Sequence, residues 1–138
     1  MKWITPSNKV VDISIKKYLI RWGEHAASKE AQVVKEFLFK YCKNHIILEE
    51  FRIPRQRLFV DFIDLNYKIA IEHQGAAHFN YIKNHFHKSK FDYLKQMKRD
   101  EEKRAILEKN GFRVIETMKK DFPLTEEWLN EIYYNNKI

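Results

Sequence analysis

Two carboxylates, an amide and an imidazole lie within a short segment of this chain. Asp61 belongs to a strand-like run, and the stretch that follows adds Glu72, Gln74 and His78. If the two stretches form a β-hairpin, both carboxylates reach the same ion and the imidazole follows directly behind them. Two hard oxygen ligands with water and a phosphate suit Mg²⁺ or Mn²⁺, and not zinc. These residue types predict a site that holds a divalent metal and a proton-transfer group beside a phosphate.

The turn of this hairpin sets the expected pairing of its acids. A two-residue loop at 65–66 places Asp61 opposite Ala70, with Glu72 as its diagonal neighbour on the same face. Because side chains of a strand alternate between faces, Gln74 shares the face of Glu72 and His73 takes the other. The ordinary alternative is a hairpin whose acids pair with nearby Lys or Arg, since ion-pair networks also gather charged residues.

A third acid lies on the long helix that is expected from 91 to 109. Asp100 shares a helix face with Leu107, so its side chain is expected to point toward the sheet. An acid on an inward face needs a partner, either a cation or a metal-bound water. Arg104, one turn further on, is the ordinary candidate for that cation. The sequence leaves both interpretations of Asp100 open.

Positive charge gathers directly after the hairpin. The chain has a formal net charge of +7, and the segment from Lys83 to Arg104 holds eight Lys or Arg against four Asp or Glu. This clustering predicts a polyanionic partner, with Lys83, Lys88 and Lys90 among its contacts.

The composition indicates one globular domain. A chain of 138 residues that is 44% hydrophobic can bury a single core. The sequence has no run long enough to span a membrane, and Met1, Lys2 and Trp3 do not begin a signal peptide, so no membrane partner is expected. The lone Cys42 excludes an internal disulfide and a Cys-based zinc cluster, which fits a reducing cytoplasm.

Hydrophobic periodicity and turn residues predict an α/β sandwich with a mixed sheet. Pro6 and Ser7 open a first helix, Ser28 caps a second, and Asn110-Gly111 ends the long one. Residues with β-branched or alternating apolar side chains predict the strands. The expected elements, in order, are helices at 6–22 and 28–41, strands at 46–53, 57–64 and 67–74, a helix at 91–109, a strand at 112–116 and a helix at 125–134.

Taken together, these motifs resemble those of a known family. The pattern is Asp61, then Ile71-Glu72-x-Gln74-Gly75-x-x-His78, then Arg99-Asp100-x-x-Lys103-Arg104, continuing to Gly111-Phe112-x-Val114-Ile115. It resembles the very-short-patch-repair-like branch of the PD-(D/E)XK nucleases, especially phage-type homing endonucleases with an EDxHD motif. The resemblance covers roughly Ser28 to Glu116. It implies an αβββαβ restriction-endonuclease-like core at 28–116, with a helical extension at 1–27 and a C-terminal helix at 117–138.

The resemblance also implies roles for individual residues. Asp61 and Glu72 would bind Mg²⁺ or Mn²⁺, His78 and Asp100 would be catalytic, and Gln74 stands where the family usually has a lysine. Arg99 and Lys103 would lie near the phosphates of DNA. The branch tends to carry a glutamate on its first core helix; here Ala31 takes that place with Glu30 one residue earlier, which leaves open whether Glu30 serves instead.

Three hypotheses about function follow. The first is a metal-dependent DNA endonuclease, as in the catalytic domain of a homing endonuclease, acting in the cytoplasm of a bacterial or phage-infected cell. The second is a non-cleaving nucleic-acid-binding module derived from a nuclease. The third is a protein-binding regulator that uses the Trp and Tyr residues of the terminal helices. The oligomeric state, including a homodimer, is left open by the sequence.

Overall fold

A four-stranded mixed sheet forms the centre of the molecule. The computed structural model describes residues 1–73 and 90–134. Strands β3 (Ile47–Arg52), β4 (Phe59–Asp64) and β5 (Ile69–His73) are antiparallel neighbours, and β6 (Arg113–Thr117) pairs parallel with β5. Parallel neighbours need a crossover connection, and the helix α2 (Lys90–Lys109) lies in that connection.

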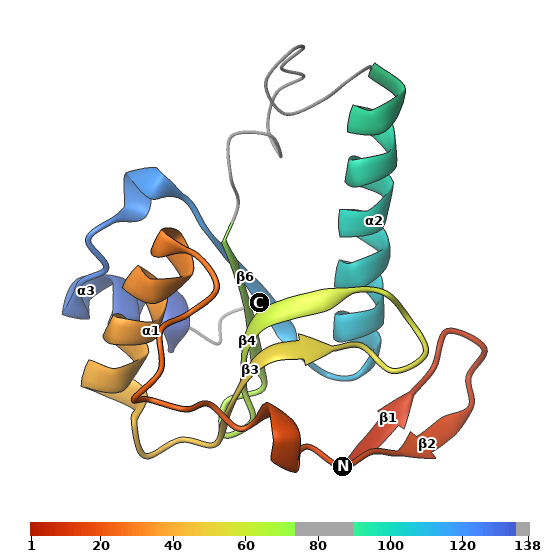
Figure 1. Cartoon of the computed structure of the whole chain (residues 1–138), viewed down its shortest axis with the longest axis horizontal. Helices are drawn as coiled ribbons and strands as arrows, with labels where there is room; N and C mark the ends of the chain where they lie inside the picture. The colour runs from red at the N-terminus through yellow and green to blue at the C-terminus, as the bar shows by residue number, and fades with distance from the viewer. Residues whose placement is uncertain (74–89, 135–138) are drawn as a thin grey trace.

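Helices cover both faces of the sheet. Helix α1 (Lys29–Cys42) lies on one face together with the C-terminal α3 (Glu126–Trp128) and η4 (Leu129–Tyr133), and α2 lies on the other (Figure 1). None of the helices in the described part of the chain combines the length and the apolar character that crossing a bilayer requires.

Each face has its own hydrophobic core. On the α1 side, Phe37, Leu38 and Phe62 pack with Tyr133 from the C-terminal segment. The other core, on the α2 side, includes Trp3, Phe51, Ile63, Leu107 and Phe112. Since Trp3 and Tyr133 are fully buried, these two aromatic residues serve the core.

Most of the predicted elements are confirmed. The Ser28 side chain accepts a hydrogen bond of 3.0 Å from the backbone N–H of Ala31 and caps α1, as expected. Thr125 caps the last helix in the same way. After α2, Gly111 adopts φ 85°, a left-handed conformation that ends a helix and favours glycine. In its described part the molecule is therefore a mixed α/β protein with a four-stranded mixed sheet and three α-helices.

The predicted helix at 6–22 is wrong. A two-stranded antiparallel ribbon, β1 (Lys2–Ile4) with β2 (Val10–Asp12), occupies its first half, and a short 3₁₀ helix, η1 (Lys16–Tyr18), follows. The turn of the ribbon forms because Thr5 accepts two hydrogen bonds, from the N–H of Asn8 to its carbonyl and from the N–H of Lys9 to its hydroxyl. The apolar side chains at helical spacing still pack on the α2-side core; they are Val11, Ile15 and Tyr18.

Candidate functional site

Two of the predicted ligands face each other across neighbouring strands. Phe62 on β4 pairs with Ile71 on β5, and the same register continued by one residue sets Asp61 directly opposite Glu72. Ala70, the predicted partner of Asp61, pairs with Ile63 instead, so the predicted pairing is wrong by two positions. Directly opposed side chains are closer than diagonal ones. The correction therefore brings the two carboxylates closer together than the sequence suggested.

The error in register arises from the turn between β4 and β5. The turn has four residues, 65–68, instead of the expected two. The buried carboxylate of Asp64 holds it, because Oδ1 accepts hydrogen bonds from the N–H groups of Asn66 (2.9 Å) and Tyr67 (3.2 Å). Lys68 completes the turn in a left-handed conformation, with φ 56°. A side-chain bond to the backbone thus replaces the tight hairpin turn.

Helix α2 adds a cation and a third acid to the pair. Lys103 donates a hydrogen bond of 3.0 Å from Nζ to Oε1 of Glu72. The pKa of Glu72 is raised to about 7. Burial is the largest cause, and the negative charge of Asp61 adds to it; Lys103 acts in the opposite direction, and Asp100 makes a smaller upward contribution. Three carboxylates and one ammonium group therefore interact in one partly buried place.

The backbone of β5 also binds Asp61. The N–H of His73 donates a hydrogen bond of 2.9 Å to Oδ2 of Asp61. The ring of His73 points to the other face of the sheet, where Nδ1 lies 3.1 Å from Oγ1 of Thr117 and the ring stacks on Phe122. The expectation that His73 faces away from the acids is confirmed.

The ordinary ion-pair interpretation holds for Glu72. Lys103 is the cation that pairs with Glu72. Arg104 forms ion pairs with Glu116 on β6 and, at 4.0 Å, with Glu108. A small pocket of about 20 Å³ is lined by Glu72, Asp100 and Lys103 among others. The structure thus brings Asp61, Glu72, Asp100 and Lys103 together.

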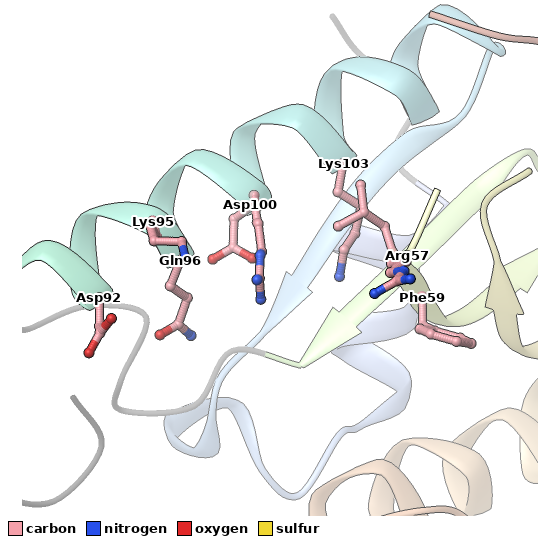
Figure 2. Close-up of a pocket in the computed structure, with 9 residues that line it drawn as sticks. Arg57, Phe59, Asp92, Lys95, Gln96, Asp100 and Lys103 are labelled. Atoms are coloured by element: carbon pink, nitrogen blue, oxygen red, sulfur yellow. The ribbon is translucent and has the colours of Figure 1, made fainter. Parts of the chain in front are cut away.

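A groove of about 500 Å³ lies between the start of β4 and α2. Figure 2 shows Asp92, Gln96 and Asp100 along the helix, opposite Arg57 and Phe59. The groove has more cationic than anionic residues, which suits a polyanion. Its lining consists of Arg57, Leu58, Phe59, Asp92, Lys95, Gln96, Arg99, Asp100 and Lys103. Because Asp100 and Lys103 also line the small pocket beside Glu72, the groove leads to the carboxylates.

Several predicted residues lie outside this arrangement. Gln74, His78, Lys83 and Lys88 fall outside the described residues. Lys90 begins α2 with an exposed side chain. Ala31 is buried in the α1-side core, and the side chain of Glu30 is exposed. The predicted phosphate contacts Arg99 and Lys103 both line the groove, although Lys103 is bound to Glu72.

Two groove residues were missed in the sequence. Arg57 and Phe59 stand at the start of β4, on the side of the groove opposite α2. A signal for Arg57 was present, because Arg52, Arg55 and Arg57 follow one another at short intervals. Phe59 carries no such signal, since an aromatic residue in a strand is most often part of the core.

A comparison with protein-family models finds no match for this chain, and a comparison with curated proteins finds none either. A function for the protein must therefore be inferred from the geometry and chemistry of the site itself.

Proposed function

We propose that the protein is a metal-dependent endonuclease that hydrolyses phosphodiester bonds in DNA. One observation carries the proposal: Asp61 lies opposite Glu72, with Asp100 nearby, where a groove rich in Lys and Arg ends. Acids alone would repel a phosphate, and cations alone would bind it without a means of cleavage. Their combination suits a site that binds the DNA backbone next to a metal ion.

The donor atoms fit Mg²⁺ or Mn²⁺. Asp61 and Glu72 offer oxygen ligands, which these hard cations prefer over nitrogen or sulfur. Mutual repulsion contributes to the raised pKa of Glu72, and a divalent cation between the two carboxylates would offset that repulsion. When bound, such an ion polarises the scissile phosphate and lowers the pKa of its water ligands.

The remaining residues of the site have complementary roles in this proposal. Lys103, which neutralises Glu72, becomes available to a phosphate oxygen once another cation binds that carboxylate. Asp100 accepts a hydrogen bond from a water of the site and orients it. Arg57, Lys95 and Arg99 contact backbone phosphates along the groove. Two further roles in the proposal rest on the sequence alone. Gln74 donates a hydrogen bond to the attacking water or to a phosphate, and His78 is the general base.

A non-cleaving DNA-binding module is the second candidate, and one observation favours it. Glu72 already has a cation, because Lys103 binds it at 3.0 Å. A satisfied ion pair needs no metal. The two candidates share the basic groove and differ in whether Mg²⁺ supports cleavage.

Plasmid cleavage separates these candidates. The protein is incubated with supercoiled plasmid in Mg²⁺, Mn²⁺ or EDTA, and nicked and linear products are measured. We expect cleavage with either metal and none in EDTA. Asp61→Asn and Glu72→Gln should abolish cleavage while DNA affinity, measured by fluorescence anisotropy in EDTA, is kept. Glu101→Gln, an exposed position on α2, is the matched control and should remain active.

The same experiment can refute the proposal. If the wild-type protein binds DNA and does not cut it with either metal, the non-cleaving module is correct. If Asp61→Asn cuts at the wild-type rate, the metal site is elsewhere.

A further inference from the structure

A second group of metal-ligand side chains lies on the α1 side of the sheet, away from Glu72. Cys42 ends α1, His45 follows in the turn to β3, and Asp64 ends β4. One ligand atom from each of the three residues lies within 4.8 Å of the other two. Nδ1 of His45 is 2.6 Å from Oδ2 of Asp64. A thiol, an imidazole and a carboxylate therefore converge on one point.

The local backbone holds this group in place. The N–H of His45 donates a hydrogen bond of 2.9 Å to the carbonyl of Cys42, so a tight turn brings the two side chains to the same end of α1. Oδ1 of Asp64 is fixed by the turn that sets the β4–β5 register. The hydroxyl of Tyr133 donates to its Oδ2. Such outer hydrogen bonds orient the ligands of metal sites.

Burial makes the group chemically unusual. Cys42 is 1% exposed and Asp64 is fully buried, whereas the side chain of His45 is 15% exposed. The pKa of the Cys42 thiol is raised to about 11, chiefly by burial and next by the nearby charge of Asp64. The partly exposed imidazole leaves a path from solvent to the group.

Hydrogen bonds already connect this group. The chain from Tyr133 through Asp64 to His45 satisfies the buried carboxylate, and the hydroxyls of Tyr133 and Tyr134 interact with the thiol of Cys42. What points to a metal is the meeting of sulfur, imidazole nitrogen and carboxylate oxygen at one place, because zinc accepts all three kinds of donor atom. A divalent cation bound there would favour the ionised form of the thiol.

We propose that Cys42, His45 and Asp64 bind a zinc ion. Zinc accepts sulfur, imidazole nitrogen and carboxylate oxygen in one tetrahedral site, whereas Mg²⁺ does not take thiolate ligands. A single cysteine cannot build a multi-cysteine cluster, but three mixed ligands with a water complete four-fold coordination. The ion would connect the end of α1 to the end of β4. This site is independent of the proposed magnesium site and of the proposed cleavage of DNA.

Cobalt titration of the full chain tests the proposal. The protein is stripped with EDTA, dialysed and titrated with Co²⁺, and its absorption is recorded. Since Cys42 is the one cysteine of the sequence, a thiolate-to-cobalt charge-transfer band must come from that residue. We expect the band to grow to one equivalent, together with the strong visible bands of tetrahedral cobalt, and to disappear when Zn²⁺ is added.

Variants separate this site from others that might hold zinc. Cys42→Ser should remove the band, and both Cys42→Ser and His45→Gln should weaken zinc affinity by more than the roughly 10- to 100-fold loss typical of an outer partner. His25→Gln, an exposed histidine, and Glu72→Gln should leave zinc affinity unchanged. Far-ultraviolet circular dichroism checks that each variant is folded.

Two results would overturn the assignment. One is a folded wild-type protein that gives no charge-transfer band with excess Co²⁺. The other is a Cys42→Ser variant that is folded and binds Zn²⁺ as tightly as the wild type, which would place any bound ion at other residues.

Discussion

Replacing Glu72 with glutamine should remove a pH-dependent loss of folding stability. In the folded protein the pKa of Glu72 is about 7, compared with an ordinary value of 4.5. Well below pH 4.5 the carboxyl is protonated in both states and has no linkage effect. As pH rises above 4.5, the unfolded chain releases this proton while the folded chain keeps it, so stability falls until the folded group also ionises near pH 7.

The size of this effect follows from the same shift. Two and a half pH units at about 1.4 kcal/mol each correspond to a full penalty of about 3 kcal/mol. Between pH 5 and pH 8, linkage gives a change of about 2–3 kcal/mol, because part of the penalty is already present at pH 5. The side chain of Glu72 is only 12% exposed, so solvent screening reduces this figure little.

Urea unfolding at pH 5 and at pH 8 measures this change in stability. Wild type and Glu72→Gln are compared in EDTA. The free energy of unfolding of the variant minus that of the wild type should rise by about 2–3 kcal/mol from pH 5 to pH 8. Any difference between glutamine and the protonated carboxyl is the same at both pH values and cancels in the comparison. Asp61→Asn, which removes a neighbouring charge, should make the wild-type dependence shallower. Glu101→Gln, at an exposed position on α2, should leave it unchanged.

A flat difference between Glu72→Gln and wild type would refute this reasoning. It would mean that Glu72 is well solvated or far from Asp61, and the register that sets the two acids opposite each other would then be wrong. Mg²⁺ provides an independent check: at pH 8 it should raise the melting temperature of the wild type, since it binds the folded state, and not that of Glu72→Gln.

Three further substitutions test the groove and the fold. Lys95→Gln, in the groove, should lower the log–log salt slope of DNA binding by roughly 0.9. Lys40→Gln, on α1, should leave the slope unchanged. If Lys95→Gln has the same slope as the wild type, DNA binds elsewhere. Lys35→Met should cost about 3–5 kcal/mol in urea unfolding, because the buried Nζ binds Glu49 at 2.9 Å; a loss below 1 kcal/mol would contradict it. Gly111→Ala should cost about 1–2 kcal/mol through its positive φ, and an unchanged midpoint would argue against that conformation.

The gathering of the acids could be predicted from the sequence. Strand alternation predicts that Asp61 and Glu72 share one face of the hairpin. Helical spacing places Asp100 on the same helix face as Leu107, which is buried. Both rules depend only on local geometry. The exact pairing could not be predicted, because the turn depends on hydrogen bonds from the Asp64 carboxylate to the backbone, and the same residues are compatible with a shorter loop.

Other features depend on contacts between distant parts of the chain. The family resemblance implies that Lys103 lies near the phosphates, and no sequence pattern shows that its position on α2 also brings it to Glu72, 31 residues earlier. The N-terminal apolar residues have helical spacing, yet a turn at Thr5 makes them a strand and a 3₁₀ helix. The Cys42 group joins residues from the end of a helix, a turn and the end of a strand, and no spacing rule connects these three.

The uneven burial of α2 has a consequence for how this protein can change in evolution. Its buried residues, Ile106 and Leu107, lie near its C-terminal end, and the N-terminal part projects beyond the sheet (Figure 1). Groove residues such as Lys95 and Arg99 lie on the projecting part. Substitutions there remove little packing, since surface changes usually alter stability by less than about 0.5 kcal/mol. One end of the helix is therefore constrained by the core, while the other can vary its ligand contacts almost without cost to folding.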